Sequence, residues 1–331
     1  MLAFLRELLE IKQEVLEQAR PLFQQIEETA EINTMKVLNA MRETRLSEAH
    51  FTTTSGYAYD DIGRQKLDEL YARVFGAEKA LVRTQFVSGT HALATVLFGL
   101  LRPGDTLLSV TGAPYDTMQT VIGYAHPSPG SLKEFGVAYD EVPLQEGRVD
   151  LTLLAQKVTS KTKVALIQRS RGYSLRPPLT LEEISQICLT IKANQPDCVC
   201  FIDNCYGEFV HSQEPIAAGA DIMAGSLIKN PGGGLAPTGG YIVGNTSLVE
   251  LASYRLTAPG MGDELGASLA NNRLLFEGLF LAPHVVSQAI KGAIFAAGVF
   301  TRLGYTVFPA TTEEREDIIQ AIEMKAPEKK L

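Results

Sequence analysis

The segment DIMAGSLIKNPGGG, residues 221–234, decides how the rest of this sequence is interpreted. Its first part is apolar and ends in small residues, which is typical of a buried strand, and a single lysine, Lys229, follows. A glycine-rich loop begins directly afterwards. Twenty-six residues before Lys229, the segment FIDN places Asp203 at the end of another apolar strand. Because ligands bind at the carboxyl ends of strands in α/β sheets, we expect both side chains in one site.

A strand-end lysine paired with a strand-end aspartate is what pyridoxal 5′-phosphate (PLP) requires. The lysine forms a Schiff base with the coenzyme, and the aspartate keeps the pyridine nitrogen protonated so that the ring accepts electrons. Burial and a nearby cationic group would lower the pKa of Lys229 and favour imine chemistry at neutral pH. Taken singly, Lys229 also fits a solvated surface lysine, and Asp203 fits an acid that caps the next turn. Their joint occurrence favours the coenzyme.

From residue 70 onward, helical and strand-like segments alternate, which predicts an α/β fold with a parallel sheet. We expect helices over 92–101, 150–158 and 181–193, and strands over 106–110, 163–168, 198–203 and 239–244. Residues 1–46 have a helical apolar period, with Pro21 at the start or at a kink of a helix.

We divide the sequence into three parts. Residues 1–50 form an N-terminal helical segment, residues 51–285 a large PLP-binding α/β domain, and residues 286–331 the start of a small C-terminal domain. The last stretch is charged and shows no convincing final strand-helix unit. We therefore expect the C-terminal domain to be truncated.

Composition excludes several classes of function. The net charge of −8 and a pI near 5.3 argue against nucleic-acid binding. Acids within the first ten residues argue against a signal peptide, and the most apolar window, 281–300, contains His284 and Lys291 and falls short of a membrane span. The four cysteines match no C-x-x-C pair, so we expect buried thiols and no metal site. The cytoplasm is the expected location.

Several residues are candidates to hold the coenzyme. Ser88-Gly89-Thr90 opens a helix, where backbone N–H groups and hydroxyls suit a phosphate, and Ser226 lies three residues before Lys229. Ordinary helix capping explains the first motif equally well. Tyr115 follows a strand, from which its ring can lie against the pyridine ring. Without the other residues, a loop tyrosine that packs locally is an equal alternative.

Two further segments carry arginines. In GYAYDDIGR, residues 56–64, Arg64 can pair with a phosphate and Tyr59 can assist acid-base steps, although Arg64 can equally form an ion pair with a neighbouring aspartate. In QRSRGYS, residues 168–174, polar side chains follow a strand and would face the coenzyme or a substrate carboxylate. The sequence leaves open which of Arg169 and Arg171 points inward.

Taken in order, these motifs resemble the fold-type I PLP enzymes, in particular the Cys/Met-metabolism group of cystathionine lyases and methionine γ-lyase. The chain looks like the branch labelled aluminium-resistance or methionine γ-lyase-like proteins. Further support comes from YDDIGR (59–64), QRSRGY (168–173) and NPGGGLAPTGG (230–240). The resemblance covers about residues 30–310. It implies a PLP-dependent transferase-like large domain with a mostly parallel seven-stranded sheet, flanking helices, N-terminal helices and an incomplete small domain.

The resemblance also implies roles for the candidate residues. Lys229 would hold the coenzyme, Asp203 would pair with the pyridinium nitrogen, Ser88-Gly89-Thr90 and Ser226 would bind the phosphate, and Tyr115 would stack on the ring. The family forms homodimers or homotetramers with sites at the interface.

Two features depart from the family pattern. The family donates a tyrosine and an arginine to the phosphate of the neighbouring subunit, and Tyr59 and Arg64 correspond to them, with a spacing that differs from the usual one. The family also supplies an arginine for the substrate α-carboxylate from the small domain. No equivalent is evident before Leu331.

We therefore expect a PLP-dependent carbon–sulfur lyase that removes a β or γ substituent from a sulfur-containing amino acid. One alternative keeps the coenzyme and changes the reaction to that of a transferase, such as a sulfhydrylase or an aminotransferase. The other is a PLP-fold protein without catalytic activity. The only expected partners are the small-molecule substrate and further copies of the chain, with neither nucleic acid nor membrane. The aluminium-resistance label finds no chemical support in these residues.

Overall fold

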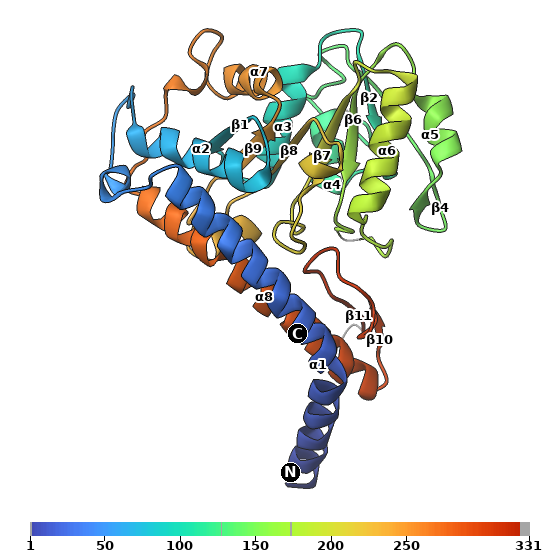
Figure 1. Ribbon diagram of the computed structural model, residues 1–331. Coiled ribbons are helices and arrows are strands. Elements are labelled where there is room, and N and C mark those ends of the chain that lie inside the picture. Colours follow the sequence, from blue (N-terminus) through green and yellow to red (C-terminus); the bar gives the residue numbers. More distant parts are fainter. Residues whose placement is uncertain (1, 127, 173, 325–331) are drawn as a thin grey trace.

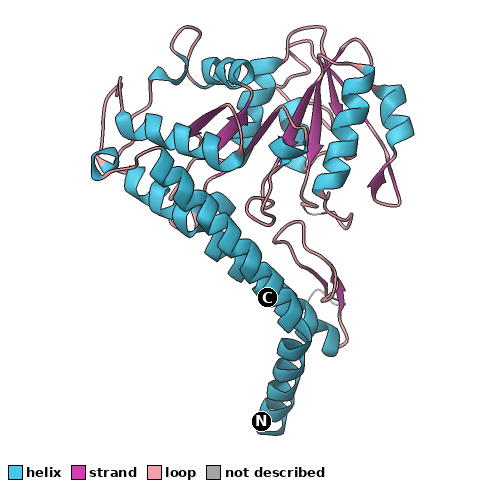
Figure 2. Ribbon diagram, viewed as in Figure 1, coloured by secondary structure: helices cyan, strands magenta, loops and turns pink. Residues whose placement is uncertain are grey.

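The computed structural model describes residues 2–126, 128–172 and 174–324. A seven-stranded sheet in the order β1-β9-β8-β7-β6-β2-β3 forms its centre (Figures 1 and 2). The strands of this sheet are β1 (Lys79–Arg83), β2 (Thr106–Ser109), β3 (Ala138–Glu141), β6 (Thr162–Gln168), β7 (Val199–Asp203), β8 (Ile222–Ser226) and β9 (Gly240–Gly244). Within this sheet, only the pairs that involve β9 are antiparallel. The prediction of a mostly parallel seven-stranded α/β sheet is confirmed.

Helices cover both faces of this sheet. The α-helices are α1 (Leu2–Glu43), α2 (Ile62–Phe75), α3 (Gly89–Leu100), α4 (Asp116–Ile122), α5 (Leu151–Lys157), α6 (Leu181–Asn194), α7 (Thr246–Leu256) and α8 (Asn272–Arg302). Apolar residues of α3, α4 and α7 pack on one face, and those of α1, α2, α5, α6 and α8 form the core on the other. The strands β7 and β8 are buried along their whole length, which explains their unbroken apolar sequences.

The two longest helices, α1 and α8, run side by side and extend away from the sheet (Figure 1). Pro21 lies inside α1, which is one continuous helix. Val15 packs where α8 has Gly298, and an ion pair joins Glu27 to Lys291. By length and composition α8 could also cross a membrane, but 44% of its apolar window is buried within the structure, as expected for a core helix.

The chain after α8 folds back towards the sheet (Figure 1). Two short strands, β10 (Thr306–Phe308) and β11 (Ala321–Glu323), pair antiparallel. Between them Asp317 is buried, and one of its carboxylate oxygens accepts a hydrogen bond from the backbone N–H of Arg171 at 3.2 Å. A separate hairpin is formed by β4 (Leu144–Gln145) and β5 (Arg148–Val149). The expected boundary after residue 285 falls within α8, and residues 325–331 of the expected small domain lie outside the described residues.

Candidate active site

The sheet brings the predicted lysine and aspartate to the same edge. Asp203 is the last residue of β7 and pairs with Gln168 of β6 on one side and Ala224 of β8 on the other. Lys229 follows β8 by three residues. The two side chains lie close enough for each to shift the pKa of the other. The carboxyl ends of adjacent parallel strands thus place both groups in one site, as expected for this sheet type.

The glycines after Lys229 fix the loop that carries it. A Cβ atom on Gly232 would overlap the backbone carbonyl oxygen of Leu227, and one on Gly233 would overlap that of Gly278 in α8. Gly233 also has a positive φ of 54°, which glycine adopts without strain. These close backbone contacts explain why the sequence needs glycine here. They hold Lys229 between β8 and α8.

Lys229 is cationic in this environment. Burial lowers its pKa, but the Cys205 sulfur and the Asp203 carboxylate outweigh burial and raise the pKa above the ordinary value. The amine also lies 4.0 Å from the centre of the Tyr206 ring, in a cation–π contact. Without a coenzyme, these negative and electron-rich groups outweigh the lowering by burial, and the lowering expected from a nearby cationic group stays a prediction for the PLP-loaded protein.

Asp203 is a buried carboxylate that needs a cationic partner. Asp203 is only 5% exposed, and one of its carboxylate oxygens accepts a hydrogen bond from the backbone N–H of Cys205 at 3.1 Å. Burial raises its pKa, and Lys229 opposes that shift. A protonated pyridine nitrogen satisfies the same need, since it presents a positive N–H to the carboxylate.

The predicted phosphate residues converge at the start of α3. Ser88 caps this helix, with its oxygen accepting the backbone N–H of His91 at 3.1 Å, so the capping role is real. The Ser226 hydroxyl is buried and has no hydrogen-bond partner among the described residues. It lies beside Gly89, where an added Cβ would approach the Ser226 Cβ to 3.2 Å. A buried hydroxyl without a partner is costly, so this position fits the phosphate of PLP.

Tyr115 links the phosphate end to the rest of the site. It precedes α4, and its hydroxyl lies 3.2 Å from the Thr90 hydroxyl. Burial raises its pKa, and both Asp203 and Lys229 lie close enough to influence it. Its half-buried ring therefore has the surroundings expected of a side chain that stacks on the coenzyme.

Tyr59 and Arg64 lie apart from this cluster. The Arg64 guanidinium donates hydrogen bonds to the carbonyl oxygens of Ala58, Glu264 and Gly266 at 2.7–3.0 Å and is buried. The Tyr59 side chain is exposed, and its ring contacts Tyr57. The structure gives Arg64 a clear role in fixing the loop before α2. Phosphate contacts by these two residues stay a prediction.

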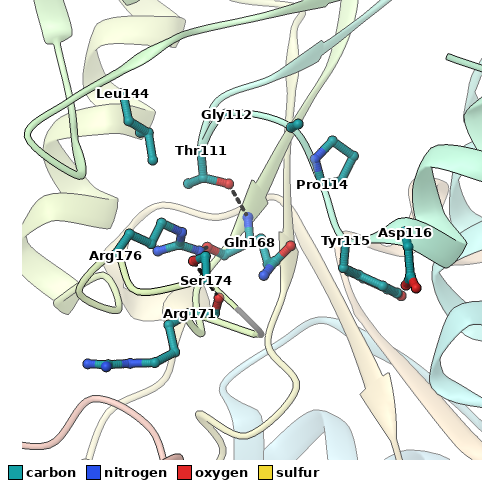
Figure 3. Close-up of a pocket in the computed structure, with 11 residues that line it drawn as sticks. Thr111, Gly112, Pro114, Tyr115, Asp116, Leu144, Gln168, Arg171, Ser174 and Arg176 are labelled. Carbon is teal, nitrogen blue, oxygen red and sulfur yellow. Dashed lines mark hydrogen bonds between the residues drawn. The ribbon is translucent and has the colours of Figure 1, made fainter. Parts of the chain in front are cut away.

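A cavity of about 520 Å³ opens beside Tyr115 (Figure 3). It is lined on one side by residues 111–116 and on the other by Gln168, Arg171, Ser174 and Arg176, with Leu144 at its margin. Arg171 lines this cavity, whereas Arg169 is held in the interior by Glu214 and Glu316, each 3.8 Å away. Sequence alone did not reveal this difference, and it also gave no sign of the Cys205 and Tyr206 contacts with Lys229.

The sheet order, the strand-end lysine and aspartate and the unpartnered serine together define a fold-type I PLP enzyme. The family model for methionine gamma-lyase matches residues 8–331. The chain therefore belongs to the methionine gamma-lyase family, and it is a PLP-dependent lyase.

Individual relatives agree with this assignment. Protein YnbB of Bacillus subtilis (strain 168) is 50% identical over 307 residues, which are 92% of this chain and 73% of that protein. The L-methionine gamma-lyase of Pseudomonas putida is 27% identical over 65% of this chain and 49% of its own length. The crystal structure of a carbon-sulfur lyase involved in aluminum resistance from Clostridium novyi NT has a TM-score of 0.95 and 47% identity, covering 98% of this chain and 78% of that one.

Proposed function

We propose that this protein cleaves a carbon–sulfur bond in a sulfur-containing amino acid. The observation that carries the proposal is the grouping of Lys229, buried Asp203 and the unpartnered Ser226 hydroxyl at one sheet edge. The names of the relatives supply the substrate class, since they include a methionine gamma-lyase and a carbon-sulfur lyase. The reaction consumes one water and yields a keto acid, ammonia and a thiol, or hydrogen sulfide where the substrate is cysteine.

The residues divide the work as follows. Ser88, Thr90 and Ser226 bind the coenzyme phosphate, Tyr115 lies against the ring, and Asp203 keeps the proton on the ring nitrogen. Bound PLP supplies an electron-accepting ring that stabilises negative charge on the substrate α-carbon. The Lys229 amine holds the coenzyme between turnovers and moves the α-proton during turnover.

We also propose that the chain acts in the cytoplasm as a homodimer or homotetramer. Exposed Tyr59 supports an interface at the loop before α2, because a 57% exposed tyrosine is available to a second subunit. The division at residues 50 and 285 belongs to the same proposal. In this division α1 is a helical segment added to the N-terminus of the large domain, and α8 connects the large domain to the small domain.

The test is turnover by the purified, PLP-loaded protein. We expect L-methionine, L-cysteine or L-cystathionine alone to yield a keto acid, ammonia and a thiol (hydrogen sulfide from L-cysteine), and Lys229→Ala to yield none of them. A strict requirement for an added thiol or keto acid would instead identify a transferase. Coenzyme binding without exchange of the substrate α-proton in any amino acid would refute catalysis.

A further inference from the structure

Three arginines lie close together beside the cavity, where Arg171 is near enough to influence the pKa of both Arg176 and Arg315. Arg171 and Arg176 come from the loop after β6 and lie across the cavity from Tyr115 (Figure 3). Arg315 comes from the segment between β10 and β11. All three residues are less than 10% exposed. Guanidinium groups rarely lose water in this way unless anions accompany them.

Carboxylates act on two members of this cluster, Arg176 and Arg315. Asp317 is the main carboxylate that acts on both Arg176 and Arg315. Burial lowers the pKa of each of these two arginines to about 10, Asp317 partly offsets burial, and Arg171 adds repulsion. Asp203 and Glu183 also act on Arg176, and Glu313 also acts on Arg315. No ion pair joins the Arg171 side chain to a carboxylate among the described residues.

Arg171 has two unpartnered donor atoms, whereas Arg315 has one, its Nε. The Nε and Nη1 atoms of Arg171 are buried and have no partner among the described residues. By contrast, Arg176 donates to the carbonyl oxygens of Gln168, Ser170 and Pro177 at 2.6–3.0 Å, so it holds the loop. Neighbouring Arg169 faces two carboxylates and hydrogen-bonds to Asn204. An unpaired buried guanidinium is costly, and a planar carboxylate is the anion that fits its donors.

The cluster adjoins the coenzyme site. Gln168, which lines the cavity, is the direct neighbour of Asp203 in the sheet. Tyr115 forms the opposite wall, and Asp203 is close enough to Arg176 to influence its pKa. With a volume of about 520 Å³, the cavity has room for an amino acid. A carboxylate held here belongs to a molecule that reaches the reacting centre.

We propose that Arg171, supported by Arg176 and Arg315, binds a carboxylate group of the amino-acid substrate. This assigns substrate recognition to the large α/β unit and to a residue of the loop after β6. The inference rests on the proposed function, because it assumes an amino-acid substrate. It does not depend on carbon–sulfur cleavage, since binding precedes bond breaking.

The experiment follows the visible absorbance of the PLP-loaded protein as amines are added. The three probes are ethylamine, which lacks a carboxylate, L-alanine, which has only the α-carboxylate, and L-glutamate, which adds one on its side chain. We expect Arg171→Met to weaken binding of a carboxylate probe by about 10- to 100-fold, the usual effect of losing a charged hydrogen bond. Binding of ethylamine stays unchanged. If Arg171→Met binds L-alanine more weakly than wild type does, Arg171 binds the α-carboxylate. If only L-glutamate binding is weakened, Arg171 binds the side-chain carboxylate.

Matched variants separate recognition from folding. Arg73→Met removes an exposed arginine that pairs with Glu43 and should leave all three titrations unchanged. Arg171→Lys should recover part of the lost affinity, and Arg171→Gln repeats the comparison if the methionine variant does not accumulate. Equal affinity of wild type and Arg171 variants for both amino acids would overturn the proposal, as would an equal loss for ethylamine. A protein that gives the expected titrations but no thiol product would refute the lyase proposal alone.

Discussion

Glu208 offers a quantitative test of the buried electrostatics beneath the site. It is fully buried, and its Oε1 accepts the Tyr241 hydroxyl at 2.7 Å while Oε2 has no partner among the described residues. A Cβ on Gly225 would approach its Oε1 to 2.7 Å, which places the carboxyl directly under β8. Burial raises the pKa of Glu208 from 4.5 to about 8. Replacing it with glutamine keeps the shape of the protonated acid and removes the titration.

The pKa shift fixes the sign and the size of the effect. Between pH 4.5 and about 8 the folded protein keeps a proton on Glu208 that the unfolded chain has released. Stability therefore falls as pH rises through this window, by at most about 1.4 kcal/mol per pH unit. The glutamine that replaces Glu208 in the variant does not titrate. The difference in free energy of unfolding, Glu208→Gln minus wild type, should consequently be about 2.5 kcal/mol larger at pH 7 than at pH 5.

Urea unfolding of the coenzyme-free proteins at pH 5, 6 and 7 measures this difference. Other groups that titrate cancel between the two proteins, so the change in the difference reports Glu208 alone. A difference that is constant across the three pH values would show that Glu208 is already ionised in the folded protein. That result would refute the assignment of a raised pKa to this carboxyl.

Two substitutions test the coenzyme cradle and the lysine loop. Ser226→Ala should weaken PLP binding by roughly tenfold without lowering the stability of the coenzyme-free protein, because the hydroxyl has no partner among the described residues to lose. Fluorescence titration measures PLP affinity and urea unfolding measures stability. A Ser226→Ala variant that loses both affinity and stability would contradict this expectation. Gly232→Ala should destabilise by about 3 kcal/mol or more, since its Cβ would overlap the Leu227 carbonyl oxygen. Gly292→Ala, in an open position of α8, should instead stabilise the protein by about 0.5–1 kcal/mol. Equal changes in stability for Gly232→Ala and Gly292→Ala in thermal unfolding would contradict this explanation.

The sheet could be anticipated from sequence where its strands are buried on both faces. The strands β7 and β8 are continuous apolar segments, with Asp203 as the last residue of β7 and Lys229 three residues after β8, and this pattern also revealed both residues in the sequence. The edge strand β3, Ala138–Glu141, is partly exposed and carries two acids, so it lacks an apolar signature. Its position follows from pairing with β2, which is a tertiary effect.

The roles of the arginines could not be anticipated in the same way. Arg169 and Arg171 are two residues apart in one motif, yet the first pairs with Glu214 and Glu316 while the second lines a cavity. These partners are contributed by distant parts of the chain. Arg64 is a similar case, since two of its three carbonyl partners lie about 200 residues away. Sequence spacing describes local structure and carries little information about such contacts.

The central claim is that Lys229 binds the coenzyme. Borohydride reduction of the PLP-loaded protein makes the lysine attachment permanent, and mass spectrometry of the peptides then locates it. We expect the phosphopyridoxyl group on the peptide that contains Lys229, with no such label in Lys229→Ala. Labelling of a different lysine, or equal labelling of the variant, would contradict the site described here.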